Sequence, residues 1–389
     1  MTRKRLLFII DSLGIGGAEK SLLALLALLN RQKYHVDLWI RQRGGELESF
    51  IPEGINALPQ PHYSTAEKLQ YRLAHLYYSV AYRVLRLTGS RRHLAEVLWQ
   101  CTGWATKVPE GEYDAAIAYQ QGMPTYLVTK KIRSKKKIVW DNINMVAAGY
   151  DMAYNRQFYA KADRIVTVSE ELQKLMVNSY PQLSGKTACI YDILSPDFIR
   201  QQSSEGDVGL PQKNNADTLI VTVGRVAVQK NYPLAIEAAG LLRDKGLSFR
   251  WYIVGDGPER TYIERLIAEQ HLQQQVTLLG ALPNPYPYMR QCDIYVQTSS
   301  FEGFGLTIAE AKILGKPVVS TCFDVVHDQL RHGHNGLIAD MTAESVAENI
   351  LRLVNDEGLR RQIIRNVEAE KNTTAETEIK KVERLLDED

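Results

Sequence analysis

Cysteine is scarce and scattered in this sequence. The four cysteines have no Cys-x-x-Cys pair and no cluster with histidine; they are Cys101, Cys189, Cys292 and Cys322. This spacing argues against a disulfide framework and against structural zinc. We therefore expect the protein to occupy a reducing compartment.

Long apolar runs are also missing. Leu6–Ile10 ends at Asp11 and is too short for the core of a signal peptide. The densest apolar stretch elsewhere, Leu22–Leu29, is far shorter than the roughly 18 residues that span a bilayer. These short runs predict a cytoplasmic protein that crosses no membrane.

Several catalytic motifs are absent as well. The sequence has no GxxxxGK[ST] loop, no GxSxG and no HExxH, and Asp-x-Asp occurs only in the charged tail, at Asp387-Glu388-Asp389. Walker-type ATP chemistry is thus unsupported, and diphosphate binding through a divalent cation is not expected. We predict no metal, no cofactor and no nucleic-acid partner.

The charge is unevenly divided along the chain. Residues 1–190 hold 26 Lys and Arg against 16 Asp and Glu, while the whole chain has a net charge of +2. Such asymmetry indicates an anionic surface or partner for the first half, unless the charges are simply solvated.

Short apolar runs alternate with helical stretches through both halves of the chain. The predicted strands are 6–10, 36–40, 115–118, 137–140, 164–168, 219–223, 249–254, 276–279, 294–297 and 317–320. This alternation predicts an α/β protein with two Rossmann-like, doubly wound domains whose carboxyl strand ends face each other across a cleft. We place the first domain at 1–200, a polar linker at 201–217, the second domain at 218–370 and a charged helix or tail at 371–389.

Residues 60–110 interrupt the alternation with a basic, aromatic, amphipathic helix. Its apolar residues recur at helical spacing: Leu69, Leu73, Leu76, Tyr77, Val80, Val84 and Leu87. The cations that mark a membrane or acceptor surface are Arg72, Arg83, Arg86, Arg91 and Arg92. Two interpretations stay open: packing on the core, or contact with a membrane surface or a lipid-linked acceptor.

Three glycine-rich or basic turns follow strands and precede helices. Gly14–Glu19 can bind a phosphate, but Glu19 stands where a dinucleotide fingerprint has its third glycine, which disfavours an oxidoreductase. Arg225 and Lys230, five residues apart, can both reach one diphosphate. The turn Gly255-Asp256-Gly257 allows a ligand to approach the backbone closely.

The segment Thr298–Ala311 is the most specific one. Glu302 lies in the loop after a strand, a helix begins near Leu306, and Glu310 lies on its second turn. Free N–H donors and the positive end of the helix dipole thus lie between two carboxylates. We expect the carboxylates to bind hydroxyl groups, one of a sugar and the other of a ribose.

These residues resemble the retaining glycosyltransferases of the GT-B fold that are marked by Glu-x7-Glu (glycosyltransferase family 4), relatives of sucrose synthase and bacterial glycogen synthase. The resemblance rests on six motifs in order: Gly16-Gly17, Arg225 with Lys230, Gly255–Gly257, Leu279-Gly280, Glu302 to Glu310 and Gly315–Val319. The opening Ser12–Glu19 resembles the branch that builds bacterial capsule, teichuronic and lipopolysaccharide chains.

The resemblance implies a role for each of these positions. Arg225 and Lys230 bind the donor diphosphate, Glu302 holds the donor sugar and Glu310 binds the ribose. The remaining donor contacts implied are Gly16, Gly17, Gly255, Asp256, Ala281, Leu282, Gly303, Phe304, Gly305, Leu306 and Thr307. The family's histidine after the strand at 137–140 is missing here, and Asp141 or Asn142 is the residue that we expect in its place.

The predicted function is therefore metal-independent, retaining transfer of a hexosyl or N-acetylhexosaminyl group. The donor is a nucleotide diphosphate sugar, UDP-linked by family pattern, and the acceptor is a glycan, lipid-linked by the branch that the chain resembles. The enzyme would act in cell-surface polysaccharide biosynthesis, in the cytoplasm or peripherally on the inner face of an anionic membrane. A sugar-nucleotide epimerase, a phosphorylase and an inactive sugar-nucleotide-binding subunit remain alternatives on the same fold.

Overall fold

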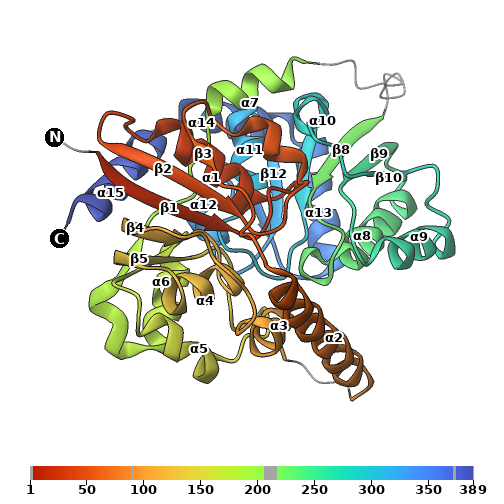
Figure 1. Cartoon of the computed structure of the whole chain (residues 1–389). Helices are drawn as coiled ribbons and strands as arrows, with labels where there is room; N and C mark the ends of the chain where they lie inside the picture. Colours follow the sequence, from red (N-terminus) through yellow and green to blue (C-terminus); the bar gives the residue numbers. More distant parts are fainter. Residues whose placement is uncertain (1–2, 89–91, 206–216, 371–373, 389) are drawn as a thin grey trace. The chain divides into compact units, whose positions relative to one another are not determined.

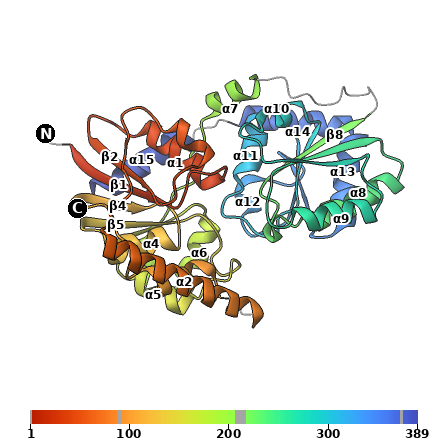
Figure 2. The ribbon, with the colours of Figure 1, turned by 45° about the vertical axis from the view of Figure 1, so that its right-hand side comes forward.

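The structure, a computed structural model, describes residues 3–88, 92–205, 217–370 and 374–388 (Figure 1). The chain divides into two compact units. Unit 1 comprises residues 1–193 with 376–389, and unit 2 comprises residues 194–375. Each unit has its own parallel sheet with helices on both faces (Figure 2).

Unit 1 has a seven-stranded sheet of order β3-β2-β1-β4-β5-β6-β7. Its strands are β1 (Lys4–Ile10), β2 (Tyr34–Ile40), β3 (Asn56–Ala57), β4 (Tyr113–Ala118), β5 (Ser134–Asp141), β6 (Arg164–Thr167) and β7 (Thr187–Cys189). Residues Leu6–Ile10 are fully buried, as expected for a central parallel strand covered on both faces. The order reverses between β1 and β4, which makes the carboxyl ends of these strands the topological switch point of this unit.

The helices of unit 1 follow its strands in a doubly wound pattern. They are α1 (Gly17–Leu28), α2 (Thr65–Leu87), α3 (Leu94–Thr102), α4 (Met123–Lys130), α5 (Met152–Tyr159), α6 (Glu170–Ser179) and, from the end of the chain, α15 (Thr374–Asp387). Short 3₁₀ segments occupy Glu46–Phe50 and Pro181–Lys186.

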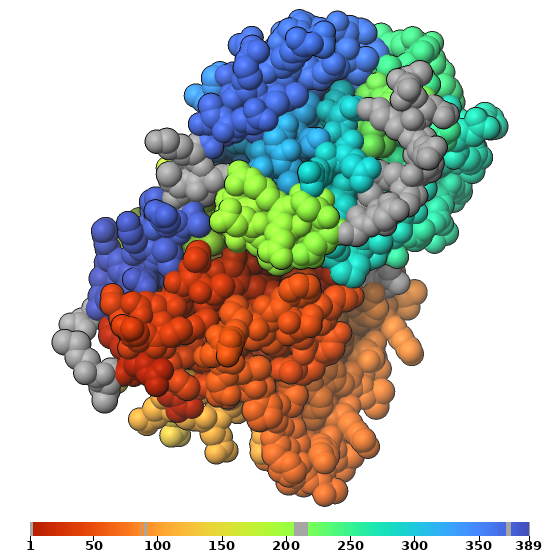
Figure 3. All heavy atoms as spheres, turned by 90° about the horizontal axis from the view of Figure 1, so that it is seen from above, coloured from red at the N-terminus to blue at the C-terminus, as the bar shows by residue number. Residues whose placement is uncertain are grey.

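The C-terminal helix α15 packs on unit 1. The Tyr34 hydroxyl donates to an Asp387 carboxylate oxygen at 2.9 Å, and Lys4 Nζ donates to the Leu386 carbonyl at 3.0 Å. Leu385 and Leu386 are buried, and Figure 3 shows the blue α15 against the red N-terminal residues. The charged tail is therefore a docked helix of the first domain.

Unit 2 has a six-stranded sheet of order β10-β9-β8-β11-β12-β13. Its strands are β8 (Thr218–Val223), β9 (Phe249–Val254), β10 (Val276–Gly280), β11 (Ile294–Gln297), β12 (Val318–Thr321) and β13 (Leu337–Ala339). Its helices are α7 (Pro196–Ser203), α8 (Tyr232–Asp244), α9 (Arg260–Glu269), α10 (Tyr286–Gln291), α11 (Leu306–Ile313), α12 (Val326–Gln329), α13 (Ala343–Asn355) and α14 (Glu357–Ala369), with a 3₁₀ turn at Val228–Lys230.

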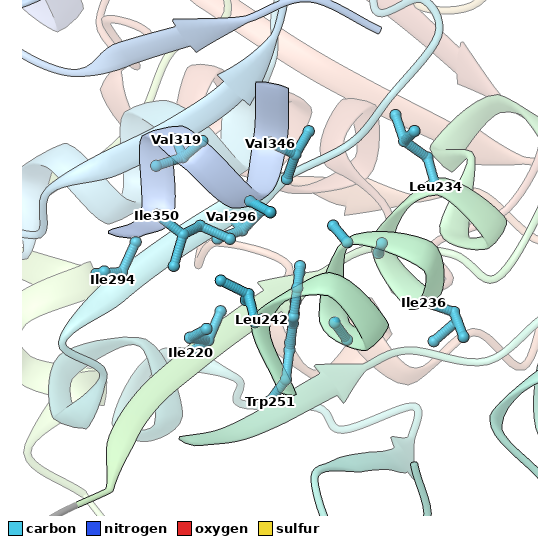
Figure 4. Close-up of a cluster of buried hydrophobic side chains, with 14 of the residues drawn as sticks. Ile220, Leu234, Ile236, Leu242, Trp251, Ile294, Val296, Val319, Val346 and Ile350 are labelled. Atoms are coloured by element: carbon cyan, nitrogen blue, oxygen red, sulfur yellow. The ribbon is translucent and has the colours of Figure 1, made fainter. Parts of the chain in front are cut away.

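A buried apolar cluster fixes the sheet of unit 2 against its helices. Leu242 of α8 and Ile350 of α13 pack with Trp251 of β9 and with Ile220 and Val296 of the central strands (Figure 4). All five side chains are buried. The central strands β8 and β11 are held rigidly by this packing, and the loops that follow them are anchored at their strand ends.

All ten predicted strands are present, most of them within two residues of the expected ends. Three short strands, β3, β7 and β13, were not predicted because two or three residues carry too little periodicity. The predicted linker 201–217 differs from the structure: residues 201–203 belong to α7, and residues 206–216 lie outside the described part of the chain.

Helix α2 presents two different faces. Its seven predicted apolar residues, Leu69 to Leu87, are 52–88% exposed, so this face does not pack on a core. The protein-facing side is a second stripe, with Ala74 buried and Tyr71 and Tyr78 half-buried, and α2 contacts α3 there. Among the described helices, α2 included, none is both long enough and apolar enough to cross a membrane.

Candidate functional site

The candidate site of unit 2 lies at the switch point of its sheet, between β8 and β11. The loop after β8 carries Arg225 and Lys230, and the loop after β11 carries Glu302. Because β8 and β11 are neighbouring parallel strands, their carboxyl ends meet at one edge of the sheet. Ligands of open α/β sheets bind at this position.

Lys230 and Glu302 are in direct contact at this edge. Lys230 Nζ lies 2.5 Å from Glu302 Oε1, and both side chains are largely buried, with 16% and 10% exposed. An ammonium group has three donors, so the contact with Glu302 leaves donors for a second acceptor such as a phosphate oxygen. The pair thus places a cation and a carboxylate side by side at the ligand edge.

Three further side chains hold the Glu302 carboxylate in place. Ser299 Oγ donates to Oε1 at 2.6 Å, Gln297 Nε2 donates to Oε1 at 2.9 Å, and Gln229 Nε2 donates to Oε2 at 3.3 Å. None of the three was predicted as a site residue. The signal was present, because Gln297 is a polar residue at the end of a buried apolar strand and polar side chains at such ends often serve a site.

The start of α11 is tied to the same group. Gly305 precedes the helix with φ +87°, a left-handed conformation that favours glycine. Thr307 Oγ1 donates to Gln297 Oε1 at 2.6 Å, so Gln297 links the helix start to Glu302. The N–H groups of the first helical turn and the positive end of the helix dipole are therefore fixed beside the carboxylate.

Glu310 lies on the second turn of α11 and is buried. The Tyr286 hydroxyl donates to its Oε1 at 2.8 Å. Burial, and secondarily the Glu310 charge, raise the pKa of Tyr286, so this hydroxyl stays a donor at every physiological pH. Tyr286 was not predicted; its role follows only from the position of α10 beside α11.

The Gly255 turn touches the Arg225 loop. The Gly224 N–H donates to the Val254 carbonyl at 2.9 Å, and the Gly255 N–H donates to the Gly280 carbonyl at 2.8 Å. A β-carbon on Gly255 would lie 1.9 Å from the Gly224 carbonyl oxygen. Only glycine fits there, because the two loops meet backbone against backbone.

The remaining predicted donor contacts of unit 2 vary in exposure. Gly303, Phe304 and Gly305 are buried, and Leu306, Thr307 and Leu282 are half-buried, whereas Arg225, Asp256 and Ala281 are exposed. Among the described residues, Arg225 makes no ion pair, while Asp256 lies 3.6 Å from Arg260. Arg225 thus offers its guanidinium to solvent from the same loop that carries Lys230.

The predicted glycines of unit 1 lie at the switch point of the first sheet. Helix α1 begins at Gly17 after Gly16. The Glu19 carboxylate folds back over this turn, 2.1 Å from where a β-carbon on Gly16 would stand, and it accepts from Gln120 Nε2 at 3.1 Å. A carboxylate of the chain itself therefore lies at this helix start, and donor contact by Gly16 and Gly17 stays a prediction.

Asp141 and Asn142 end β5 in unit 1. Asp141 is 1% exposed and accepts a hydrogen bond from the Tyr159 hydroxyl. Burial raises the pKa of Asp141 to about 7, with the Tyr159 hydrogen bond opposing the rise. Asn142 Nδ2 donates to the Tyr119 carbonyl at 2.7 Å. Both side chains are thus engaged inside the first domain, and a catalytic role for either stays a prediction.

The predicted surface cations of unit 1 do not all fall within the described residues. Arg72 and Arg83 are exposed on α2, and Arg92 Nη2 donates to Gln100 Oε1 at 3.0 Å. Arg91 and the Arg86 side chain lie outside the described part. The described residues contain no group of three or more His, Cys, Asp or Glu placed to hold a metal ion.

Comparisons with known proteins agree with this geometry. Residues 210–370 match the family model of glycosyl transferases group 1. The chain is 24% identical over 307 residues to an uncharacterized glycosyltransferase of Methanocaldococcus jannaschii, covering 68% of this chain and 76% of the relative.

Two further matches cover more of the chain. It is 26% identical over 358 residues to the N-acetylgalactosamine-N,N'-diacetylbacillosaminyl-diphospho-undecaprenol 4-alpha-N-acetylgalactosaminyltransferase of Campylobacter jejuni, covering 90% of each. The crystal structure of Anabaena HepE with UDP and glucose superposes with a TM-score of 0.72 at 18% identity, over 99% of both chains. The fold is that of the GT-B glycosyltransferases, and residues 210–370 are similar to the glycosyl transferases of group 1.

Proposed function

We propose that this chain is a retaining, metal-independent glycosyltransferase of the family marked by Glu-x7-Glu, glycosyltransferase family 4. It would transfer a hexosyl or N-acetylhexosaminyl group from a UDP-sugar. The observation that carries the proposal is the Lys230–Glu302 pair at the switch point of unit 2, beside the start of α11. A cation, fixed helix N–H groups and a buried carboxylate together suit a sugar that is leaving a diphosphate.

In this proposal each group has one task. Arg225 and Lys230 bind the diphosphate and neutralise the charge that develops as the bond to the sugar breaks, in place of a divalent cation. Glu302, held by Gln297 and Ser299, accepts hydrogen bonds from sugar hydroxyls. Glu310, supported by Tyr286, accepts from the ribose.

The relatives support the choice of donor and stereochemistry. HepE was solved with UDP and glucose, and the Campylobacter relative is named for an α linkage. UDP-hexoses are themselves α-linked, so an α product is the retaining outcome. In the proposed mechanism the leaving phosphate helps to deprotonate the acceptor on the same face of the sugar, which requires no basic side chain.

We further propose that the acceptor is a lipid-linked glycan of cell-surface polysaccharide synthesis, met peripherally at a membrane. The exposed apolar face of α2, with Arg72 and Arg83 beside it, suits an anionic lipid surface. The Campylobacter relative is named for a diphospho-undecaprenol acceptor. The inner membrane face is the surface that we propose.

A donor screen followed by a transfer assay tests the proposal. Thermal shifts with UDP-, GDP- and ADP-sugars should show the largest stabilisation with a UDP-sugar. Turnover of that sugar should persist in EDTA, give an α-linked product by NMR and fall at least 100-fold in Lys230→Ala and Glu302→Gln.

Lys245→Ala, an exposed lysine of the same unit, is the matched control and should turn over normally. If Lys230→Ala and Glu302→Gln both matched this control, the site assignment would be wrong. A β-linked product would overturn retention, and activity lost in EDTA but restored by Mn²⁺ would overturn metal independence.

A further inference from the structure

Unit 1 contains a cavity of about 200 Å³ that the donor site does not use. It lies where β2 and β3 end and where the first turns of α2 begin, one strand over from the β1/β4 switch point. Four cations line it, and no carboxylate does: the cations are Arg41, Lys68, Arg72 and Lys107. We call this cavity the basic pocket.

The charges of the basic pocket are only partly neutralised by carboxylates around it. Arg41 Nε lies 2.6 Å from an Asp11 carboxylate oxygen, and Lys107 Nζ lies 2.8 Å from Glu67. Within the described residues, Lys68 and Arg72 make no ion pair, and both are exposed. Two cations are thus anchored as a rigid base and two others can converge on a ligand, which gives the pocket a positive excess that suits an anion.

A buried donor points to the same conclusion. Trp39 lines the basic pocket and is 1% exposed, yet its indole Nε1–H finds no hydrogen-bond partner among the residues that the structure describes. A buried unsatisfied donor is costly and uncommon in a folded protein. An indole N–H can only donate, so the missing partner is an acceptor. The Nε1 atom has almost no exposed surface, so a phosphate oxygen in the pocket would supply this acceptor once the indole edge opens toward it.

Part of the pocket wall is aromatic. The Tyr63 and Tyr71 rings lie 5.2 Å apart, and Lys107 Nζ lies 5.7 Å from the Tyr63 ring centroid. The Tyr63 hydroxyl accepts the Lys107 N–H at 2.8 Å. These contacts tie the aromatic side of the pocket to Lys107.

The exposed apolar face of α2 begins at the mouth of this pocket. Leu69 and Leu73 directly follow Lys68 and Arg72, the two unpaired cations, and both leucines are more than half exposed. A ligand with a phosphate in the basic pocket could therefore extend an apolar chain along α2. We propose that the basic pocket binds the phosphate or diphosphate group of a lipid-linked acceptor. That the ligand is an acceptor of sugar transfer rests on the proposed function. That the pocket binds a phosphate group rests on the pocket's own residues.

Binding can be measured without any sugar transfer. Calorimetric titrations would use the full chain carrying Lys230→Ala, so that the donor loop contributes little, with farnesyl diphosphate and inorganic pyrophosphate as probes. Arg72→Gln should weaken farnesyl diphosphate binding about tenfold, the effect of one lost charge-assisted hydrogen bond. Arg83→Gln removes the same charge from the same helix outside the pocket and should change affinity less than twofold.

The indole of Trp39 gives a direct reading of occupancy. The chain has five tryptophans, so the ¹H–¹⁵N spectrum should hold five indole signals, and Trp39→Phe assigns one of them. Farnesyl diphosphate should shift this signal downfield. An unmoved Trp39 signal would overturn the proposal that the basic pocket binds the phosphate group. Equal effects of Arg72→Gln and Arg83→Gln on affinity would overturn it as well.

The two probes separate the possible sources of the phosphate. Farnesyl diphosphate should bind at least tenfold more tightly than pyrophosphate, and Leu73→Ser should remove that advantage. Equal affinities for farnesyl diphosphate and pyrophosphate would overturn the proposal that the ligand is lipid-linked. The pocket would then be a site for soluble phosphates. Because no step uses UDP-sugar turnover, failure here is distinct from failure of the transferase proposal.

Discussion

Lys230 and Glu302, separated by 72 positions, meet at 2.5 Å in the loops that follow two neighbouring parallel strands. Removal of one partner leaves the other charge partly buried without its counter-charge, which costs more than the pair contributes. Lys230→Met and Glu302→Gln should therefore each destabilise unit 2 and each reduce turnover about 100-fold.

A double-mutant cycle checks this coupling. The double variant should be less impaired than the two single losses added together, in both thermal midpoint and kcat/KM. Strict additivity in both measurements would show that the two groups act independently.

The backbone contact between Gly255 and Gly224 predicts a strong effect of one methyl group. Gly255→Ala would place its β-carbon 1.9 Å from the Gly224 carbonyl oxygen, so the loop that carries Arg225 and Lys230 must move. We expect lower thermal stability and weaker UDP-sugar binding by calorimetry.

Gly246→Ala is the control for this substitution. Gly246 has φ +78°, and no atom lies within 4 Å of where its β-carbon would stand, so alanine there adds only the left-handed strain of roughly 1–2 kcal/mol. Gly255→Ala should lower the thermal stability more than Gly246→Ala does. Only Gly255→Ala should weaken UDP-sugar binding. Equal losses would show that backbone conformation, and not the contact, matters.

Tyr286 supports Glu310 from outside the predicted motif. Tyr286→Phe removes the donor at 2.8 Å and leaves a buried carboxylate oxygen with one partner fewer, a loss of about 1–3 kcal/mol. UDP affinity should fall about tenfold, whereas Tyr262→Phe, on the exposed face of α9, should leave it unchanged. A Tyr286→Phe variant with normal UDP affinity would remove Glu310 from ribose binding.

The strands of both domains could be predicted because burial on both faces leaves a local signal in the sequence. Runs such as Leu6–Ile10 are apolar along their whole length, as burial on both faces requires. The turns that follow the central strands could be predicted as well, because each apolar run marks where its turn begins. Lys230 and Glu302 lie in the loops after β8 and β11, and they can meet because these two strands are neighbours in the sheet.

The rest of the site depends on packing between distant segments. Tyr286 reaches Glu310 across 24 positions from another helix, and Trp39 joins Lys68 and Arg72 only because α2 lies beside the end of β2. No spacing in the sequence specifies these neighbours. The exposure of the Leu69–Leu87 face likewise could not be predicted, because α2 has two apolar stripes and the sequence does not say which one packs.

The exposed face of α2 should bind membranes by apolar contact as well as charge. Leu73→Ser with Leu76→Ser should weaken binding to anionic vesicles at least tenfold at every salt concentration, because each exposed leucine contributes up to about 2 kcal/mol when buried in lipid.

Arg83→Ser, a substitution of similar size, should weaken vesicle binding mainly at low ionic strength. Cosedimentation over a range of salt concentrations distinguishes the two effects. Unchanged binding in the double leucine variant would place α2 away from the membrane.

The buried Asp141 predicts a dependence of stability on pH. Its pKa is about 7 in the folded chain, against roughly 4 for an exposed aspartate, so folding takes up a proton between these values. The contribution of this proton to stability is complete below pH 4 and is lost as the pH rises through 7. Asp141→Asn keeps the acceptor for Tyr159 and cannot ionise.

The variant should therefore gain stability relative to wild type by about 3 kcal/mol between pH 5 and pH 8, measured as the difference in thermal midpoint. Asp114→Asn provides the contrast, because Lys135 lowers the pKa of Asp114. That variant should lose stability relative to wild type above pH 4, and by a small amount, since the Asp114 pair is exposed. A constant midpoint difference for Asp141→Asn across this pH range would mean that Asp141 is ionised in the folded chain throughout, as a catalytic carboxylate in contact with a cation would be.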